Sequence, residues 1–329
     1  MRILHIVPEA PGGGTSIFIE RQIKRLDEGG IVSRTIIFAG DHLSRHPIEW
    51  PRNLLRLRRE IACFRPDVVH AHWGSLLGFS AVVANSGRFP LVVTFRGSDL
   101  NPVPSERRSR SAIRLACSHL TTMFATYVIC VSPRLGACIL TKVNSAVVPD
   151  GTDLTLFYPH SKTAARMQLG WLKSDCVVLF YAGRNSAVKR LDLACSSFEY
   201  AKERVPSLKL VVIRGDVSPD DMPIWLSAAD CVLMTSDYEG SPNIVREALA
   251  CNTPVVTVPV GDVERWVTGV AGTRLVARSK DALGNAIIDV VRSGERPFAS
   301  TTPSRFSELA SVKSIVSIYE RLKEASTSV

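Results

Sequence analysis

Short runs of aliphatic and β-branched residues recur along the chain, and each is followed by a polar turn and a longer stretch with helical spacing. Runs that are apolar at every position are typical of parallel strands, because helices cover both faces of such a sheet. Repeated strand–helix alternation indicates doubly wound α/β domains. The predicted strands are residues 1–7, 34–38, 67–70, 91–95, 127–131, 146–148, 176–181, 208–213, 231–234 and 254–258.

The alternation breaks off after a turn at residues 149–153, and it resumes near residue 176. A chain of 329 residues is long enough for two domains. We expect one Rossmann-like domain over residues 1–155 and a second over residues 156–305. Within residues 306–329, apolar positions recur at helical spacing, which predicts a C-terminal helix that docks back on the first domain.

Composition excludes several classes of protein. The chain is 46% hydrophobic and 22% charged, which is ordinary for a folded globular protein. The apolar stretch before Pro8 is too short for a signal-peptide core or a membrane span. Eight cysteines are scattered singly, with no Cys-x-x-Cys pair, which indicates reduced core residues of a cytosolic protein. We therefore expect a cytoplasmic protein.

Positive charge is concentrated in the first half of the chain. The net charge is +9, and residues 1–160 hold 19 Lys and Arg against 12 Asp and Glu, whereas the remainder holds 21 against 19. This asymmetry indicates an anionic partner, either a membrane surface, an acidic glycan or a nucleic acid; surplus arginine that only maintains solubility is an equal alternative. No nucleic-acid module or aromatic–basic platform is present, so we do not expect nucleic-acid binding.

The loop after the strand at 176–181 contains two cations, Arg184 and Lys189, together with Gly183. Ligands of doubly wound domains bind at the carboxyl ends of parallel strands. The guanidinium of an arginine and the point charge of a lysine suit a diphosphate. Two solvated surface cations remain the alternative at this stage.

A second candidate segment runs from Asp237 to Cys251 and holds two carboxylates, Glu239 and Glu247. Gly240 to Asn243 predict a tight turn into a helix, where backbone N–H groups and the helix dipole favour an anion. At ~1.5 Å rise per residue, the two carboxylates lie roughly 12 Å apart along the helix axis. This separation is too large for two carboxylates that act on one bond, but it suits contacts at opposite ends of one elongated ligand.

The N-terminal strand leads into a glycine-rich turn at residues 12–14, followed by a helical pattern at 17–26. Glycines allow close approach of the backbone to a ligand, although a plain flexible turn is equally consistent. The dinucleotide fingerprint Gly-x-Gly-x-x-Gly is absent here, since Ile17 stands at its third glycine position, and the chain has no Walker motif.

In this order, the segments resemble the retaining glycosyltransferases of family 4, the group 1 transferases with a GT-B fold, over nearly the whole chain. That resemblance implies two Rossmann-like domains that face each other across a cleft. The matching segments are the Glu-x7-Glu spacing of Glu239 and Glu247, Ala229-Asp230 before it and Pro254–Val256 after it, Gly183-Arg184 with Lys189, Val148–Asp153 with Phe157, Asp67–His72 and Val131-Ser132.

The resemblance also implies a function: transfer of a sugar from a nucleotide-diphosphate donor, with a UDP-sugar favoured, to a glycan or lipid-linked acceptor in cell-surface polysaccharide or glycolipid synthesis. Arg184 and Lys189 would bind the donor diphosphate in place of a metal, and no cofactor is expected. Glu239 would contact the transferred sugar, and Glu247 the ribose. Retention would follow a front-face path without a protein nucleophile. The remaining donor contacts would come from Gly13, Gly14, Gly183, Gly240, Ser241, Pro242, Asn243 and Ile244.

One position departs from the family pattern. Where the family has Thr-x-His-Gly-x-Asp, with the histidine at the donor sugar, this chain has Thr94-Phe95-Arg96-Gly97-Ser98-Asp99. An arginine cannot shuttle a proton at neutral pH. Either the histidine is dispensable, or Arg96 meets an anionic group of sugar or acceptor, or activity is lost. We expect Arg96, Asp99 and His72 to contact acceptor or sugar.

His70 and His72 are predicted to point to opposite faces of their strand, so that only one reaches the site. In the helical pattern at 51–66, leucines, Ile61 and Phe64 share one face and arginines occupy the rest. This pattern is typical of a helix that lies on an anionic membrane, here the inner face of the plasma membrane. A core-packed helix with solvated arginines is the alternative.

Two other functions remain open from the sequence. Arg96 is compatible with a non-catalytic GT-B protein that binds a sugar nucleotide or serves as a partner subunit. A sugar-nucleotide epimerase on a related fold would act without an acceptor.

Overall fold

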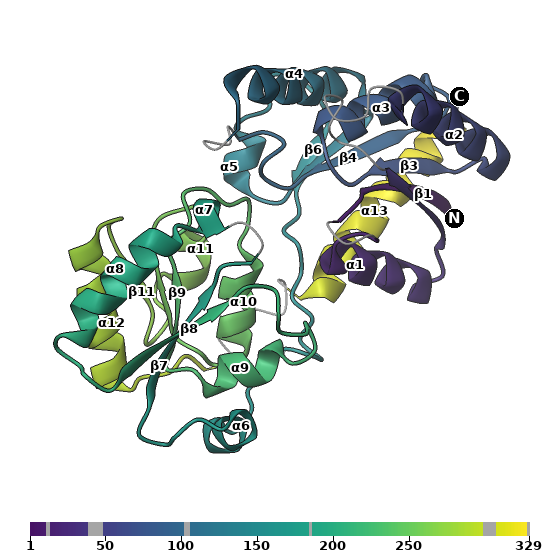
Figure 1. Cartoon of the computed structure of the whole chain (residues 1–329). Helices are drawn as coiled ribbons and strands as arrows, with labels where there is room; N and C mark the ends of the chain where they lie inside the picture. Colours follow the sequence, from purple (N-terminus) through teal and green to yellow (C-terminus); the bar gives the residue numbers. More distant parts are fainter. Residues whose placement is uncertain (11–13, 39–48, 102–105, 184–185, 299–306, 328–329) are drawn as a thin grey trace. The chain divides into compact units, whose positions relative to one another are not determined.

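The computed structural model describes residues 1–10, 14–38, 49–101, 106–183, 186–298 and 307–327. The chain divides into two compact units (Figure 1): unit 1 is Met1–Gly151 with Glu308–Val329, and unit 2 is Thr152–Ser307. Each unit is built on one parallel sheet. The predicted class, α/β with two doubly wound parallel sheets, is confirmed.

Unit 1 contains a six-stranded sheet in the order β2-β1-β3-β4-β5-β6. The order reverses between β1 and β3, because the chain adds β2 on one side of β1 and all later strands on the other. In register, Ile3 of β1 lies opposite Val68 of β3, and His5 lies opposite His70. The strands are β1 Arg2–Pro8, β2 Val32–Phe38, β3 Val68–Ala71, β4 Leu91–Phe95, β5 Tyr127–Cys130 and β6 Ser145–Val147.

Helices cover both faces of this sheet (Figure 1). One layer contains α2 Glu49–Phe64, α3 Ser75–Asn85 and α4 Arg108–Phe124, with α3 packed between its two neighbours. The short α5, Pro133–Gly136, follows β5, and its first turn is capped by the Ser132 hydroxyl. The opposite layer contains α1 Ile17–Glu28 and the C-terminal α13 Glu308–Thr327.

Helix α13 joins residues at the two ends of the sequence into one core. Its apolar side chains Ile315 and Ile318 are buried against Ile3 of β1 and Val68 of β3. The Tyr319 hydroxyl is also buried and lies 2.5 Å from a ring nitrogen of His70. Unit 1 is therefore completed by a helix that begins more than 150 residues after its last strand.

Unit 2 contains a five-stranded sheet in the order β11-β10-β9-β7-β8, with its reversal between β7 and β9. Its strands are β7 Cys176–Tyr181, β8 Leu208–Ile213, β9 Cys231–Met234, β10 Val255–Thr257 and β11 Arg274–Leu275. Strand β11 has only two residues and was not among the predicted strands. Such a short edge strand carries no periodic signal in the sequence.

The helices of unit 2 also form two layers (Figure 1). Helices α8 Leu191–Lys202 and α12 Lys280–Ser293 pack together on one face, and α9 Met222–Ala228 and α10 Asn243–Ala250 lie on the other. The remaining helices are α6 Lys162–Leu169, which packs on α9, and the short α7 Ser186–Lys189 and α11 Glu264–Val267.

Burial favours the core-packed alternative for residues 51–66, and it corrects the expectation that the cysteines are core residues. The apolar face of α2 is packed into the core of unit 1, with Leu57, Ile61 and Phe64 buried, so this face is not available to a membrane. The cysteines are free thiols, but only Cys130, Cys231 and Cys251 are buried, and the others are partly or fully exposed. Within the described residues, no helix is long and apolar enough to cross a bilayer.

Candidate active site

The strand reversal in unit 2 fixes where a ligand site forms. At a reversal, the loops that follow two neighbouring strands run to opposite faces of the sheet and leave a crevice at the carboxyl edge. Here the loops follow β7 and β9, and they contain the residues that the sequence singled out: Gly183 and Lys189 after β7, and Glu239 to Asn243 after β9. Arg184 lies outside the described residues, so its predicted role stays a prediction.

Hydrogen bonds tie these two loops together. The Thr235 hydroxyl, just after β9, donates to the carbonyls of Lys189 at 2.7 Å and Arg190 at 3.0 Å. The backbone N–H of Asp237 donates to the carbonyl of Val188 at 3.0 Å. The backbone around Lys189 is therefore held by the strand that also leads to Glu239.

The side chains of Lys189 and Glu239 form an ion pair, with Nζ 2.5 Å from Oε1. The Lys189 side chain is 22% exposed and that of Glu239 is 16% exposed, so both remain in contact with solvent. The structure thus brings together a predicted phosphate ligand and a predicted sugar ligand from loops 50 residues apart.

The segment from Gly240 to Ile244 leads into α10, which begins at Asn243 directly after Pro242. The Ile244 side chain is buried in the core of unit 2, so only its backbone can face a ligand. A helix start presents N–H groups without intrahelical partners, and these favour an anion. Glu247 lies one turn into the helix and is half-buried.

Arg246 is a residue that the sequence interpretation missed. It is fully buried on α10, and its guanidinium donates to the Ser241 hydroxyl and to Oδ1 of Asn243. Its guanidinium carbon also lies 5.0 Å from the centre of the Trp266 ring. Arg246 therefore fixes two side chains of the predicted donor loop. Its position inside Glu-x7-Glu gave no signal, because arginine is usually exposed.

The charge of Arg246 is balanced by Asp262, which accepts a hydrogen bond from Ser241 at 2.9 Å. Burial raises the pKa of the Asp262 carboxyl, and the nearby Arg246 charge opposes this shift. Gly261 precedes Asp262 with a φ of +59°, and a Cβ there would lie 2.8 Å from the Gly240 carbonyl oxygen. A glycine is therefore needed where the loop after β10 packs on the donor loop.

A second set of interactions that the sequence interpretation missed also stabilises the loops after β7 and β9. Arg278, after β11, donates to the Ser236 carbonyl at 2.6 Å and to Oδ1 of Asp237 at 2.8 Å. Arg190 reaches the same Asp237 oxygen at 3.1 Å and also binds Asp192, whose carboxyl pKa it lowers. Arg278 carries no sequence signal, because its partners lie about 40 residues earlier.

In unit 1, Arg96 follows β4 and is buried among partners from its own chain. Its guanidinium forms an ion pair with Asp150 and lies 3.3 Å from Oε1 of Gln22. It also lies 3.2 Å from Nδ1 of His72 and 4.9 Å from the centre of the Phe18 ring. The Arg96 side chain is 3% exposed, and Asp150 balances its charge. Arg96 therefore does not require an anionic substrate as a partner.

Asp99 is also built into the fold. Its fully buried carboxylate accepts hydrogen bonds from the backbone N–H groups of Gly74, Arg96 and Gly97 at 2.8–3.2 Å. Burial raises the pKa of Asp99, whereas these N–H groups act in the opposite direction. The carboxylate holds the loops after β3 and β4 together. A contact of Asp99 or Arg96 with acceptor or sugar stays a prediction.

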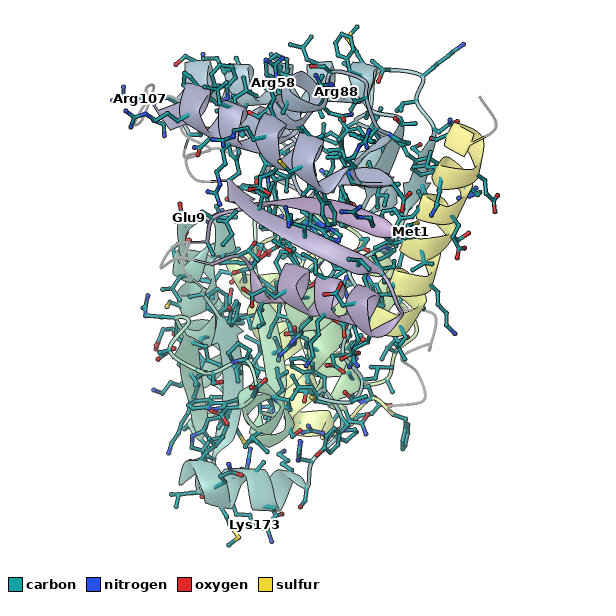
Figure 2. All side chains as sticks on the ribbon, turned by 90° about the vertical axis from the view of Figure 1, so that its right-hand side faces the viewer. Met1, Glu9, Arg58, Arg88, Arg107 and Lys173 are labelled. Atoms are coloured by element: carbon teal, nitrogen blue, oxygen red, sulfur yellow. The ribbon has the colours of Figure 1, made fainter. Side chains whose placement is uncertain are left out.

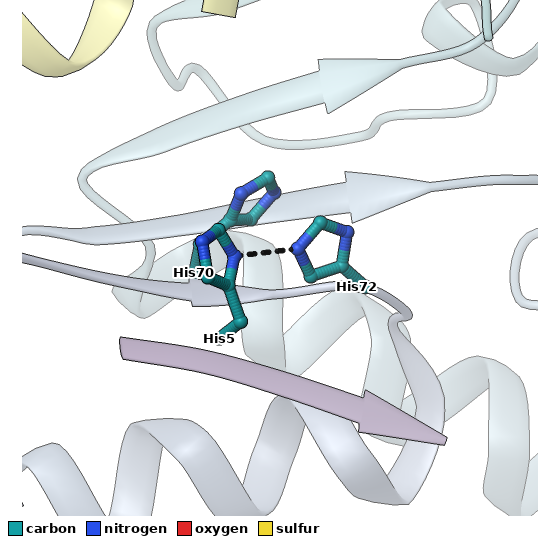
Figure 3. A group of neighbouring side chains, drawn as sticks. All are labelled: His5, His70 and His72. Carbon is teal, nitrogen blue, oxygen red and sulfur yellow. Dashed lines mark hydrogen bonds between the residues drawn. The ribbon is translucent and has the colours of Figure 1, made fainter. Parts of the chain in front are cut away.

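His70 and His72 lie on the same face of the sheet, and the prediction of opposite faces was wrong. Residues two apart on a strand share a face, and the two rings stack with centroids 4.0 Å apart. His5 from β1 joins them (Figure 3), with its Nδ1 2.9 Å from Nε2 of His72. All three side chains are buried.

The three imidazoles place one ring nitrogen each within 4.8 Å of the others, a spacing that a metal ion would accept. Hydrogen bonds already occupy their nitrogens. Arg96 can only donate, so Nδ1 of His72 accepts and its Nε2–H donates to His5. His5 then reaches Ser33 at 3.4 Å. The Arg96 charge beside His72 further disfavours a cation, so the cluster fits a neutral hydrogen-bonded network.

Histidine pKa values follow from this burial. Desolvation lowers the pKa of His5 from 6.5 to about 3, because the charged form loses its hydration. Burial also lowers the pKa of His70 and of His72, and the neighbouring Arg96 charge lowers both further. His70 is satisfied at both ring nitrogens, by the Tyr319 hydroxyl and by Thr94 at 2.7 Å.

Of the glycine-rich turn after β1, Gly13 lies outside the described residues. Gly14 has a φ of +71°, and its carbonyl accepts a hydrogen bond from the Ala10 N–H at 2.9 Å, which closes the turn. The Thr15 hydroxyl donates to the Pro8 carbonyl at 3.0 Å. A contact between this turn and a donor stays a prediction.

Comparisons with known proteins show the family of the chain. The family described as "Glycosyl transferases group 1" matches residues 174–293, and that described as "Glycosyl transferase 4-like domain" matches residues 14–149. TuaC of Bacillus subtilis strain 168, named as a teichuronic acid biosynthesis glycosyltransferase, is 30% identical over 240 residues, 68% of this chain and 60% of TuaC. The chain thus spans less than two thirds of that relative.

Solved structures share the fold. Sucrose-phosphate synthase from Thermosynechococcus elongatus superposes with a TM-score of 0.76 at 20% identity, over 98% of this chain and 99% of that one. Anabaena HepE, solved in complex with UDP and glucose, superposes with a TM-score of 0.71 at 16% identity, over 97% and 99%. The chain belongs to the group 1 glycosyltransferases of family 4 and has their GT-B fold.

Proposed function

We propose that the protein transfers a sugar from a nucleotide-diphosphate donor, with a UDP-sugar favoured, to a glycan or lipid-linked acceptor, with retention of anomeric configuration. The observation that carries this proposal is the Lys189–Glu239 pair beside the start of α10, at the strand reversal of unit 2. A cation, a carboxylate and helix N–H groups together suit the diphosphate and hydroxyls of a nucleotide sugar.

Each group has a distinct task in this proposal. Lys189, with Arg184, binds the diphosphate, and Glu239 accepts hydrogen bonds from the transferred sugar. N–H groups at residues 240–244 hold sugar and phosphate, and Glu247, farther along α10, accepts from the ribose hydroxyls. Arg246 holds the side chains of Ser241 and Asn243 in place, so that the loop is preorganised.

The reaction breaks the bond between the anomeric carbon and the diphosphate oxygen and forms one bond to an acceptor oxygen on the same face. The departing diphosphate receives the acceptor proton, and the side chains of Lys189 and Arg184 stabilise its developing charge. The chain has no Asp-x-Asp motif to hold a divalent ion, so we propose that side chains rather than a metal supply this charge.

Two relatives support the substrate classes. HepE was solved with UDP and glucose, which supports a UDP-sugar donor. TuaC is named for teichuronic acid biosynthesis, which supports an acceptor in cell-surface polysaccharide synthesis. We accordingly propose a cytoplasmic enzyme with an acceptor at the inner face of the plasma membrane.

A thermal-shift panel tests the donor assignment. UDP-, GDP-, ADP- and TDP-sugars are compared with the free nucleotides, in wild type and in Glu247→Gln. We expect a UDP-sugar to raise the melting temperature most, since ligands stabilise the native state that binds them. Glu247→Gln should reduce the shift for the UDP, GDP and ADP compounds, because these share the ribose. Wild-type shifts that are absent for every nucleotide would contradict the assignment.

A further inference from the structure

We propose that the outer face of α4, with the turn after α5, docks unit 1 on a lipid bilayer that contains anionic headgroups. The inference deepens the proposed function, on which it rests only for the lipid-linked acceptor. It assigns the membrane contact to α4 instead of the helix at residues 51–66 that the sequence indicated. Three observations carry it: an exposed apolar stripe, cations on both sides of it, and a stretch of chain without carboxylates.

Helix α4 exposes large apolar side chains instead of burying them. Ile113, Met123 and Phe124 are 61–62% exposed, and Leu120 is 40% exposed. Leu140, after α5, is 79% exposed, and its neighbour Thr141 donates a hydrogen bond to Thr122 in the last turn of α4. This hydrogen bond holds the segment that contains Leu140 at the C-terminal turn of α4, which also contains Met123 and Phe124.

These residues recur at helical spacing and define one face. At 3.6 residues per turn, positions 112, 113, 116, 120, 123 and 124 fall within an arc of about 120°. Alanines at 112 and 116 are exposed within the same arc. The buried residues of α4, Ser118, Thr121 and Thr122, are small and polar. Helix α4 thus reverses the usual arrangement, because its more apolar face points away from the core.

Cations flank this stripe. By the same helical geometry, Arg108 and Arg110 lie about 100° to either side of its centre. Arg107 and Arg108 are exposed at its N-terminal end, and Lys142 is exposed in the turn that carries Leu140. An apolar strip between cationic flanks is the arrangement of helices that lie at the headgroup–acyl boundary.

Cations predominate around the stripe. The nearest preceding carboxylate, that of Glu106, forms an ion pair with Arg114 of α4 at 2.9 Å. Residues 107–149 include six Lys and Arg and no Asp or Glu. Beyond α4, the same layer adds exposed arginines on α2 and after α3. Figure 2 shows Arg58, Arg88 and Arg107 along one outer edge of unit 1. This one-sided charge is complementary to a broad anionic surface, and it selects a bilayer over a protein partner of mixed charge.

Helix α2 differs from α4 in the exposure of its apolar face. Its arginines at 52, 56, 58 and 59 are exposed, but its apolar face is buried, and Leu55 is its exposed large apolar residue, at 61%. Helix α2 can therefore contribute electrostatic attraction, whereas insertion of apolar side chains requires α4. This difference provides a control that is matched in exposure and lies in the same helical layer.

Vesicle co-sedimentation tests the proposal. The full chain is mixed with phosphatidylcholine vesicles, with or without phosphatidylglycerol, in the absence of any donor. We expect binding to require phosphatidylglycerol and to weaken when salt rises from about 0.05 to about 0.5 M. Met123→Ser/Phe124→Ser should lower the partition coefficient roughly tenfold or more, as should Ile113→Ser to a smaller extent. Leu55→Ser should leave it within about twofold.

A second set of variants tests the role of the cations. Arg107→Gln/Arg108→Gln should weaken binding to anionic vesicles at low salt. Lys202→Gln/Arg204→Gln in unit 2 is the matched control. Equal effects of Leu55→Ser and Met123→Ser/Phe124→Ser would overturn the assignment to α4. The assignment would also be overturned if light scattering without lipid showed a wild-type dimer that becomes a monomer in Met123→Ser/Phe124→Ser. UDP binding should be unchanged in every α4 variant, so failure of docking is distinguishable from failure of the donor site.

Discussion

Lys189 Nζ lies 2.5 Å from Glu239 Oε1, although the two residues belong to loops after different strands. The donor diphosphate and the transferred sugar are adjacent in a nucleotide sugar, so a cation and a carboxylate in contact match two neighbouring parts of one ligand. The pair also leaves Lys189 partly neutralised until a diphosphate is present.

Glu239→Gln separates the two roles of this pair. The substitution keeps the size of the side chain and removes the charge opposite Lys189, so UDP affinity should remain within about threefold or rise. Turnover should fall by ~10², because the sugar hydroxyls lose a charged acceptor. Calorimetry with UDP and initial rates with the sugar donor measure the two effects. A tenfold loss of UDP affinity would show that Glu239 acts only by positioning Lys189.

Arg246→Met is expected to lower the free energy of unfolding by about 3 kcal/mol, because it leaves buried Asp262 without its balancing charge. Urea denaturation measures this loss. Arg214→Met, at an exposed position of unit 2, should change stability by no more than about 0.5 kcal/mol. In Arg246→Met/Asp262→Asn the losses should be less than additive. Additive losses in this cycle would show that the two side chains are not coupled.

Arg96→Gln tests whether this arginine reads substrate charge. The structure pairs Arg96 with Asp150, so we expect a stability loss of about 3 kcal/mol and equal proportional losses of kcat/KM on charged and neutral acceptors. Asp150→Asn should reproduce the stability loss. A selective loss on the anionic acceptor would instead support the substrate contact that the sequence suggested.

The histidine network predicts a dependence of stability on pH. The pKa of His5 is lowered to about 3, and those of His70 and His72 are also lowered, so the native state stays neutral where the unfolded state gains protons. The contribution of these histidines to stability should be constant above pH 6.5 and fall as pH drops below it, by ~1.4 kcal/mol per pH unit for each histidine.

Urea denaturation of wild type and His5→Gln, at several values between about pH 7.5 and 5.5, measures this slope. The variant should have a shallower slope below pH 6.5, whatever its stability at pH 7.5, because one proton-binding group is removed. An unchanged slope in His5→Gln would show that His5 is not neutral in the folded protein.

Much of the fold was predictable because buried parallel strands leave continuous apolar runs; β4, β7, β8 and β9 have the predicted bounds. The loops proposed to bind the donor were predicted from the strand ends and the motif spacing. Partners distant in sequence were not predictable: Arg96 meets Asp150 54 residues later, and nothing in either local segment indicates the other. The prediction for His70 and His72 was wrong because it applied strand geometry incorrectly. The exposed face of α4 could not be predicted, because it depends on which face of α4 is covered by α3.

The central claim is that unit 2 binds a nucleotide sugar and releases its diphosphate with side-chain cations in place of a metal. UDP release from UDP-sugars, measured with and without EDTA, tests it in wild type, Lys189→Ala and the surface control Lys202→Ala. The account predicts release that survives EDTA, falls by ~10²–10³ in Lys189→Ala and is unchanged in Lys202→Ala. Release that stops on chelation and returns with Mg²⁺, or that persists in Lys189→Ala at the wild-type rate, would contradict it.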